Sequence, residues 1–461
     1  MKRRKLAGYL ALSCLCSAML SAGCTLQNNN NHVLPSEGQI VIPNGQGNNG
    51  DKKGTDSWKF PLEYGKQVPA YYESSDVEVQ KKNLSAQAAG RIRSFASESS
   101  AEIFPEVQGN YLYSPASLYM ALELCGSLTY EDSASDLMEL LGVKDREELL
   151  AQGNTLIRTL SSDEEGNLLK IGNSAWIDRD WIPAISQAGY EKLDKSAAAL
   201  GTDIYREILL EQSTRDKINS WISDRTNGLI KEMPVEPEKD TAMILFNTLY
   251  FDKHWARTIK ENEVVKAEFY PAGTDSAVEI DRIEYSMESH PFVKTEHAVS
   301  SAAMYQDGSY IIFIKPASDQ ALEAAMTEDL SEVINAYARH SFTQPEDRWV
   351  VQFGIPLVDY ETKIEDLDKV ISKMGVSSVF QAGTFSDIGP ELYVSNIAQD
   401  CRIIVDREGT KAAAVTEMTL AGAILMEEPE IIDMRLDHEY GYVIMSKDDI
   451  PLFIGAVRDP G

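Results

Sequence analysis

Cysteine, histidine and basic residues are all scarce in this chain of 461 residues. The five cysteines and six histidines show neither the number nor the spacing of a disulfide scaffold or a metal site. The 43 basic residues are outnumbered by 72 acidic ones, which gives a formal net charge of −29. Phosphate backbones and anionic lipid surfaces repel such a chain, so we expect no nucleic-acid partner.

Local catalytic signatures are missing as well. The chain has no G-x-S-x-G elbow, no H-E-x-x-H and no Walker loop. Gly45 to Gly50 formally match G-x-G-x-x-G, but no convincing strand precedes them and no amphipathic helix follows. We therefore expect no catalytic residues, no cofactor and no metal. An exported hydrolase stays open as an alternative that no motif supports.

The first residues have the pattern of an export signal. Four basic residues at positions 2–5 precede an apolar run, Leu6 to Leu20, that is short for a membrane span. The run ends in Leu-Ser-Ala-Gly-Cys, which resembles the bacterial lipobox. Residues 1–23 are thus expected to be a lipoprotein signal peptide and Cys24 the lipidated residue. An ordinary signal peptide cut near the same place is the alternative.

Export would leave a lipid-anchored protein at the cell surface, facing outward and touching the membrane only through its anchor. Removal of the signal takes four basic and no acidic residues, so the net charge becomes −33. Residues 24–75 are polar and rich in Asn and Gly near their start, which indicates a flexible tether. Residues 76–461 form one globular region. Its two cysteines, Cys125 and Cys401, lie in apolar surroundings and are interpreted as small, unpaired core residues, with a bridge as the alternative.

Apolar spacing predicts an α+β fold with helices early and strands late. Helical spacing appears in three sets: Leu84, Ala88, Ile92 and Phe95; Leu137, Leu140 and Leu141 after an Asp132 or Ser133 cap; and Ile218, Trp221, Ile222 and Ile230. Strand-like runs dominate afterwards: 243–251, 310–314, 350–358, 403–405, 442–445 and 452–457. Helices and strands do not alternate regularly, so a βαβ fold is not expected.

One segment near the end of the chain carries a two-residue alternation. From Thr410, every second residue up to Leu420 is uncharged and mostly small, whereas the opposite face holds Lys411 and Glu417. A strand with one buried face requires such a pattern. Three successive alanines and nearby glycines are also typical of a loop. The segment can therefore exist as a loop or as a strand.

This segment resembles the reactive-loop hinge of the serpin family, in the run Gly409, Thr410, Lys411, Ala412, Ala413, Ala414, Val415 and Thr416. Five further stretches match the family in order. They are Asn110–Ser117 (helix B entry); Ile218–Ile222 with Thr226–Gly228 (helix F); Asn247–Phe251 with Trp255 (central strand and breach); Leu367, Met374–Gly375, Phe380 and Phe385–Ser386 (the segment before the shutter); and Phe453–Val457 with Pro460 (the last strand).

The resemblance implies a fold of helices around a large mixed sheet, with an exposed reactive loop at about 409–430. It also implies a monomeric inhibitor that traps serine proteases covalently when its cut loop inserts into the sheet. The family's spacing places the reactive bond between Ala423 and Ile424, with Leu425 or Met426 as fallback positions. A small residue before the bond suits an elastase-like or subtilisin-like protease.

The resemblance assigns the hinge to Gly409, Thr410, Ala412, Ala413, Ala414 and Thr416, and the shutter and breach to Ser114, Ser117, Asn247, Trp255 and Gln399. Two positions depart from the family pattern. Arg407 stands where an acidic residue is usual, so its ion pair must be rewired. Gln399 stands where histidine is frequent, and an amide can still bond to the shutter serines. There are two competing hypotheses. One is a non-inhibitory serpin that binds or scaffolds, and the other is a solute-binding or adhesive surface lipoprotein whose likeness to the hinge is due to chance.

Overall fold

The computed structural model describes residues 15–22, 38–40 and 84–460, except 132, 165–166, 234–236, 319–320, 365 and 409–428. For residues 15–22 and 38–40 it describes the backbone. The predicted lipidation site Cys24 and nearly all of the tether lie outside the described residues. Within the described residues after 40, the first element is α1, and the predicted boundary at residue 76 lies outside the described residues.

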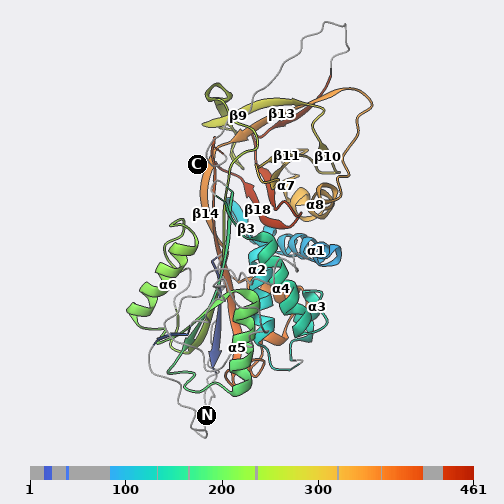
Figure 1. The fold of residues 1–461 in the computed structure, drawn as a ribbon. Coiled ribbons are helices and arrows are strands. Elements are labelled where there is room, and N and C mark those ends of the chain that lie inside the picture. Colours follow the sequence, from blue (N-terminus) through green and yellow to red (C-terminus); the bar gives the residue numbers. More distant parts are fainter. Residues whose placement is uncertain are drawn as a thin grey trace, which may run out of the picture.

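A large mixed sheet runs through the length of the molecule (Figure 1). Its strands lie in the order β14-β15-β1-β7-β5-β6-β2, and β4 pairs with β5. Most neighbours are antiparallel, but β5 and β6 are parallel. The bounds are β14 (Val358–Ile364), β15 (Leu392–Val405), β1 (Leu15–Ala22), β7 (Thr241–Lys253), β5 (Asn167–Asp178), β6 (Thr202–Glu207), β2 (Gly38–Ile40) and β4 (Ser162–Glu164).

Two smaller sheets lie toward the upper end in Figure 1. The first has the order β10-β11-β12-β17-β18-β3, and the second has the order β16-β13-β9-β8. Their bounds are β10 (Phe292–Lys294), β11 (Ala298–Met304), β12 (Tyr310–Pro316), β17 (Tyr440–Met445), β18 (Pro451–Val457), β3 (Tyr111–Tyr113), β16 (Glu430–Arg435), β13 (Trp349–Pro356), β9 (Val278–Glu288) and β8 (Val264–Phe269).

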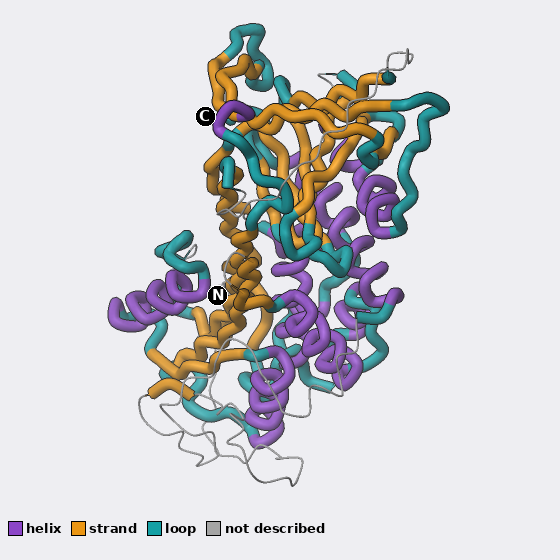
Figure 2. Tube along the Cα trace, turned by 45° about the horizontal axis from the view of Figure 1, so that its top comes forward, coloured by secondary structure: helices purple, strands orange, loops and turns teal. Residues whose placement is uncertain are grey.

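The helices divide between the two faces of the large sheet, as Figures 1 and 2 show: α6 stands apart on one side, and α1 to α5 pack together on the other. Their bounds are α1 (Ala86–Ile103), α2 (Pro115–Leu128), α3 (Ser135–Leu140), α4 (Arg146–Leu160), α5 (Gln187–Leu200), α6 (Gln212–Arg225), α7 (Leu322–Thr327), α8 (Leu330–Ala338) and α9 (Leu367–Lys373), with short 3-10 turns at η2 (Phe104–Glu106), η3 (Glu261–Glu263) and η4 (Ser378–Phe380). Among the described residues no helix is long and apolar enough to cross a membrane.

Helix α2 is the central element of the core. Ser114 caps it, because its hydroxyl accepts the backbone N–H of Ser117, and Pro115 occupies the first turn, where no N–H is needed. Every residue of α2 is buried, and the helix contacts β7, β18 and the other helices of its face. A helix that is buried all round has no polar face, which agrees with its mostly apolar sequence.

The α+β prediction is confirmed, with several local corrections. The second predicted helix is capped by Ala134 rather than by Ser133. The third ends at Arg225, so Ile230 lies beyond it. The run 350–358 divides between β13 and β14 at Leu357. Cys125 is a free, buried thiol, but Cys401 is disulfide-bonded, so its interpretation as an unpaired core residue is wrong.

The position between β7 and β15 is filled by part of the expected leader. Strand β1 runs antiparallel to both neighbours, with Thr241 to Thr248 opposite it on β7 and Leu392 to Gln399 opposite it on β15. Central strands form ladder bonds on both edges, and this pairing uses the lower parts of both flanking strands. The sheet therefore has room for one additional antiparallel strand at this place, which we call the slot.

Candidate functional site

The upper part of the slot, beyond Leu15 at the start of β1, contains a cavity. Strand β7 continues past Thr248 to Lys253, and β15 continues past Gln399 to Val405. A cavity of about 150 Å³ lies between these upper parts, and its apolar lining includes Leu249, Phe251, Tyr305, Ile403, Val405 and Phe453. Within the described part of the chain no strand separates them here. The cavity adjoins the end of β15, from which the predicted hinge departs.

Trp255 closes the upper end of the slot. Its indole N–H donates to the backbone carbonyl of Asp406 over 3.0 Å, and its ring stacks on Tyr305 with centroids 4.7 Å apart. The indole thus links the chain after β7 to the turn after β15. The breach role that the family resemblance assigned to Trp255 stays a prediction.

Arg407, which stands where the family usually has an acidic residue, pairs with an acidic partner. Its guanidinium lies 3.5 Å from the carboxylate of Glu261, just before β8. Both side chains are substantially exposed, so the pair contributes little to stability.

Four shutter residues meet below the cavity, at the centre of the molecule. The Gln399 amide bonds to the backbone of Ser114 in both directions, accepting from its N–H over 2.7 Å and donating to its carbonyl over 2.9 Å. Ser114 donates its hydroxyl to the carbonyl of Leu452 over 2.7 Å. Ser117 donates to the side-chain oxygen of Asn247 over 2.6 Å. All four side chains are fully buried, so these groups have no access to water.

The shutter joins α2 to the two strands that border the slot. Gln399 belongs to β15, Asn247 belongs to β7, and both serines lie at the start of α2. Sequence reasoning found these residues, but it missed Asn173 on β5. The side-chain oxygen of Asn173 accepts from the Asn247 amide over 2.6 Å, and its own amide donates to the carbonyl of Leu200 over 2.6 Å. Residues 167–178 were not among the predicted strands, and Asn173 lies between Gly172 and Ser174, so no local pattern marked it.

Loss of the Gln399 amide is expected to destabilise the native protein. Gln399→Ala leaves the buried N–H of Ser114 without its partner, which costs about 1–3 kcal/mol, whereas the Ser114 carbonyl keeps the N–H of Leu118. We expect a lower thermal midpoint and a lower denaturant midpoint than in the wild type. Gln187→Ala, on the exposed face of α5, is the matched control. Equal midpoints for Gln399→Ala and the control would show that the shutter bonds do not hold this region.

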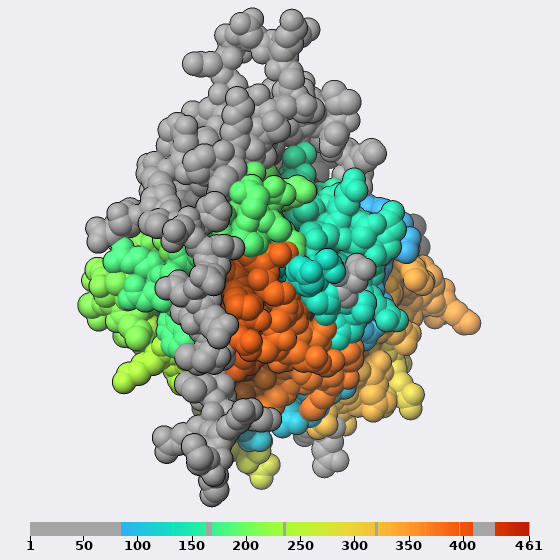
Figure 3. All heavy atoms as spheres, turned by 90° about the horizontal axis from the view of Figure 1, so that it is seen from below, coloured from blue at the N-terminus to red at the C-terminus, as the bar shows by residue number. Residues whose placement is uncertain are grey.

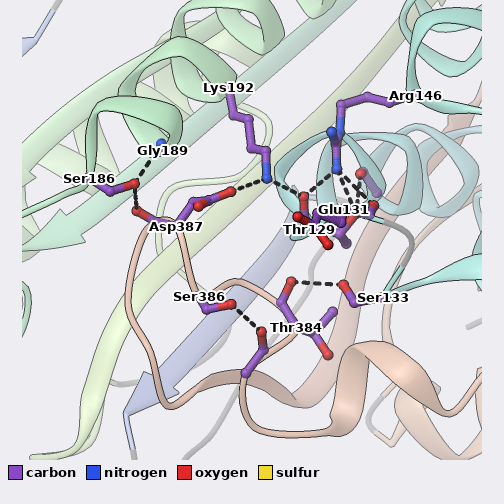
Figure 4. A network of polar contacts seen from close by, with 12 residues as sticks. Thr129, Glu131, Ser133, Arg146, Ser186, Gly189, Lys192, Thr384, Ser386 and Asp387 are labelled. Carbon is purple, nitrogen blue, oxygen red and sulfur yellow. Dashed lines mark hydrogen bonds and ion pairs between the residues drawn. The ribbon is translucent and has the colours of Figure 1, made fainter.

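A second polar network fixes the lower end of β15 (Figure 4). The Lys192 ammonium on α5 pairs with the carboxylate of Asp387 and donates to the carbonyl of Thr129 over 2.7 Å. Ser186 donates its hydroxyl to the carbonyl of Asp387 over 2.7 Å. The N–H of Tyr130 donates to the carbonyl of Thr384 over 2.6 Å. From below, the orange segment that leads into β15 lies against the green and teal helices (Figure 3).

The predicted hinge and reactive bond lie outside the described residues. They are Gly409, Thr410, Ala412, Ala413, Ala414, Thr416, Ala423 and Ile424. The structure does place the two anchors of this segment: β15 ends at Val405 in the large sheet, and β16 begins at Glu430 in the four-stranded sheet. Among the described residues, no group of three or more His, Cys, Asp or Glu side chains could hold a metal ion.

Comparison with known proteins agrees with this architecture. The family model "Serpin (serine protease inhibitor)" matches residues 91–460. The chain belongs to the serpin family. Serpins are generally protease inhibitors rather than enzymes.

Similar serpins come from distant organisms. An uncharacterised serpin-like protein of Methanosarcina mazei is 25% identical over 416 residues, which cover 85% of this chain and 93% of the relative. The horse (Equus caballus) leukocyte elastase inhibitor is 23% identical over 363 residues, covering 76% and 93% of the two chains.

Solved structures show the same serpin fold. The native state of the thermophilic serpin tengpin matches with a TM-score of 0.69 and 21% identity, covering 82% of this chain and 95% of tengpin. Human thyroxine-binding globulin, complexed with its hormone, matches with a TM-score of 0.68 and 20% identity, covering 81% and 98%. At this identity the likeness establishes the fold alone.

Proposed function

We propose that this serpin is an exported, lipid-anchored inhibitor that traps serine proteases by inserting its cleaved reactive loop into the slot between β7 and β15. The observation that carries the proposal is the slot. Its upper part is an apolar cavity beside the end of β15. Its lower part holds a strand antiparallel to both neighbours, the direction that a loop returning from the end of β15 would take.

The loop sequence suits this position. An inserted strand would turn Thr410, Ala412, Ala414 and the following alternate residues toward the helices, and none of these carries a charge. The small side chains of the loop suit the cavity of about 150 Å³ in the upper slot. Ala423 before the proposed bond favours proteases with a small or apolar primary pocket, of the elastase or subtilisin type.

The experiment is incubation of the chain from Cys24 onward with elastase-like, subtilisin-like and trypsin-like proteases, followed by a denaturing gel. We expect a band at the summed mass with the first two classes and simple cleavage or no reaction with the third. The mass of the small fragment should correspond to residues 424–461. A fragment that begins after Leu425 or Met426 would correct the position of the bond. Cleavage without any stable band would favour the alternative, a serpin that binds or scaffolds without inhibiting.

Removal of the leader is predicted to be necessary for trapping, because β1 occupies the lower slot in the full chain. We expect the full chain to be cleaved as a substrate, and the chain from Cys24 onward to form the stable complex with the same protease. Both are measured by the ratio of complex to cleaved product on a denaturing gel.

A proline in the leader is the control for this prediction. Ala18 pairs with Leu245 on β7 and Ile397 on β15, and proline cannot supply the N–H of a central strand. The full chain with Ala18→Pro should therefore trap protease better than the unaltered full chain. Equal trapping by the full and shortened chains would show that β1 does not block the slot.

A further inference from the structure

A buried carboxyl group lies between α2, α4 and α5. Glu123 on α2 has no exposed surface. One of its oxygens accepts from the amide of Gln152 on α4 over 3.3 Å, and the other, Oε2, has no hydrogen-bond partner among the described groups. The backbone of α4 passes directly over it at Gly153, where a Cβ would lie 2.9 Å from Oε2 and 2.5 Å from the side chain of Leu200 on α5. The three helices meet at this carboxyl without spare room.

The surroundings of this carboxyl favour its neutral form. Burial raises the pKa of Glu123 to about 8, and the hydrogen bond from Gln152 offsets only part of that rise. The titratable neighbour on its own helix is Tyr119, whose pKa is also raised, first by burial and then by Glu123. The positive charge of Arg91 on α1 opposes this rise in the pKa of Tyr119. Toward Glu123, α4 presents the Gln152 amide and the Gly153 backbone, and α5 presents Leu200, none of which titrates.

The end of α5 connects this carboxyl to the shutter. The carbonyl of Leu200 accepts from Asn173, which in turn bonds to Asn247, the partner of Ser117. The preceding carbonyl, of Ala199, accepts from Asn154 on α4 over 2.7 Å. Leu200 therefore contacts the Glu123 site through its side chain and the shutter through its backbone. A displacement of α4 against α5 must disturb both.

We propose that Glu123 is a pH-sensitive regulator of the shutter, which keeps the sheet closed while neutral and loosens it when ionised under alkaline conditions. Ionisation places a charge beside an apolar contact without a cation to compensate it, so α4 and α5 should separate from α2. The hydrogen bonds of Asn173 to Leu200 and to Asn247 then weaken, and the strands that border the slot part more readily. The loosening itself depends only on the described contacts. Its effect on inhibitor lifetime rests on the proposed function.

The direction of the pH effect follows from the raised pKa of Glu123. The stabilisation from its neutral form is complete below the ordinary pKa of a glutamate, declines as the pH rises, and is lost once the pH passes about 8. Glu123→Gln keeps the shape and a neutral amide at every pH. It should therefore remove this part of the pH dependence.

The test is the thermal midpoint of the wild type and of Glu123→Gln between pH 6 and pH 10. We expect the wild-type midpoint to fall by several degrees more than that of Glu123→Gln, since each kcal/mol corresponds to roughly 1–4 °C in a domain of this size. Glu147→Gln, on the exposed face of α4, is the matched control and should follow the wild type. Parallel curves for all three proteins would overturn the proposal.

Two further measurements distinguish a failure of this proposal from a failure of the proposed inhibitory function. The protection factor of the amides in the last turn of α5, which is the exchange rate corrected for its base-catalysed intrinsic value, should fall in the wild type between pH 7 and pH 9, and this measurement needs neither a variant nor a protease. An unchanged protection factor there would also overturn the proposal. If the protein inhibits a protease, its activity should decay faster at pH 9 than at pH 7, and Glu123→Gln should abolish that difference. A thermal difference in a protein that never inhibits would support the pH response and contradict the inhibitory function.

Discussion

Replacement of Thr410 by arginine is expected to convert the protein from an inhibitor into a substrate of its target protease. The alternation from Thr410 to Leu420 turns position 410 toward the helices once the loop enters the slot. The upper slot is lined by apolar side chains such as Leu249, Ile403 and Phe453. A guanidinium there would lose its hydration, which is unfavourable even though Asp252 and Asp406 also line the cavity.

The effect of Thr410→Arg should be large because trapping is a race between insertion and hydrolysis of the acyl-enzyme. Each 1.4 kcal/mol added to the barrier for insertion slows it about tenfold, so even a partial penalty diverts most molecules to cleavage. The measurement is the ratio of stable complex to cleaved inhibitor on a denaturing gel.

Ala413→Arg is the matched control for that substitution. It introduces the same side chain on the opposite face of the inserted strand, where Lys411 and Glu417 already lie. Trapping should survive in Ala413→Arg and fail in Thr410→Arg. If both variants trapped protease equally well, insertion of this segment could not be the mechanism.

Cleavage of the loop is expected to raise the thermal midpoint by more than about 20 °C. A new central strand of about 15 residues gains roughly 15–20 ladder hydrogen bonds at about 0.5–1.5 kcal/mol each, on the order of 10–25 kcal/mol in total. The uncleaved protein would then be held in its active state by a kinetic barrier rather than by its stability. The measurement compares the midpoint of the chain from Cys24 onward before and after limited proteolysis within residues 409–428.

Thr410→Arg serves again as the comparison. The cleaved variant should gain little stability, because its loop stays outside the sheet. A cleaved wild type whose midpoint does not move would contradict insertion, and it would favour a binding or adhesive lipoprotein that carries a chance hinge.

The fold could be predicted from the sequence because it depends on local patterns. Apolar periodicity locates α1 and most of the later strands, and a short run of family residues locates Ser114, Ser117 and Asn247. The amide of Gln399 could be expected to bond there from its donor and acceptor groups alone. These inferences need no knowledge of distant contacts.

Other parts of the site depend on contacts between segments far apart in the chain. The ion pair of Lys192 with Asp387 joins residues separated by 195 positions, and no local pattern indicates it. Glu123 is one of 72 acidic residues, and only the packing of three helices shows that it is buried. The place of β1 in the slot was also not predicted, because an apolar run at the start of a chain has the same pattern in a leader as in a strand.

The strands that follow the reactive loop have a practical consequence for work with the nicked protein. The fragment beyond the proposed bond contains β16, β17 and β18, which pair with β13, β12 and β3, and most side chains of β17 and β18 are fully enclosed. A cut in the loop therefore breaks the chain without detaching either piece. Gel filtration or native mass spectrometry should show one particle of unchanged size, and only denaturant should release the short peptide.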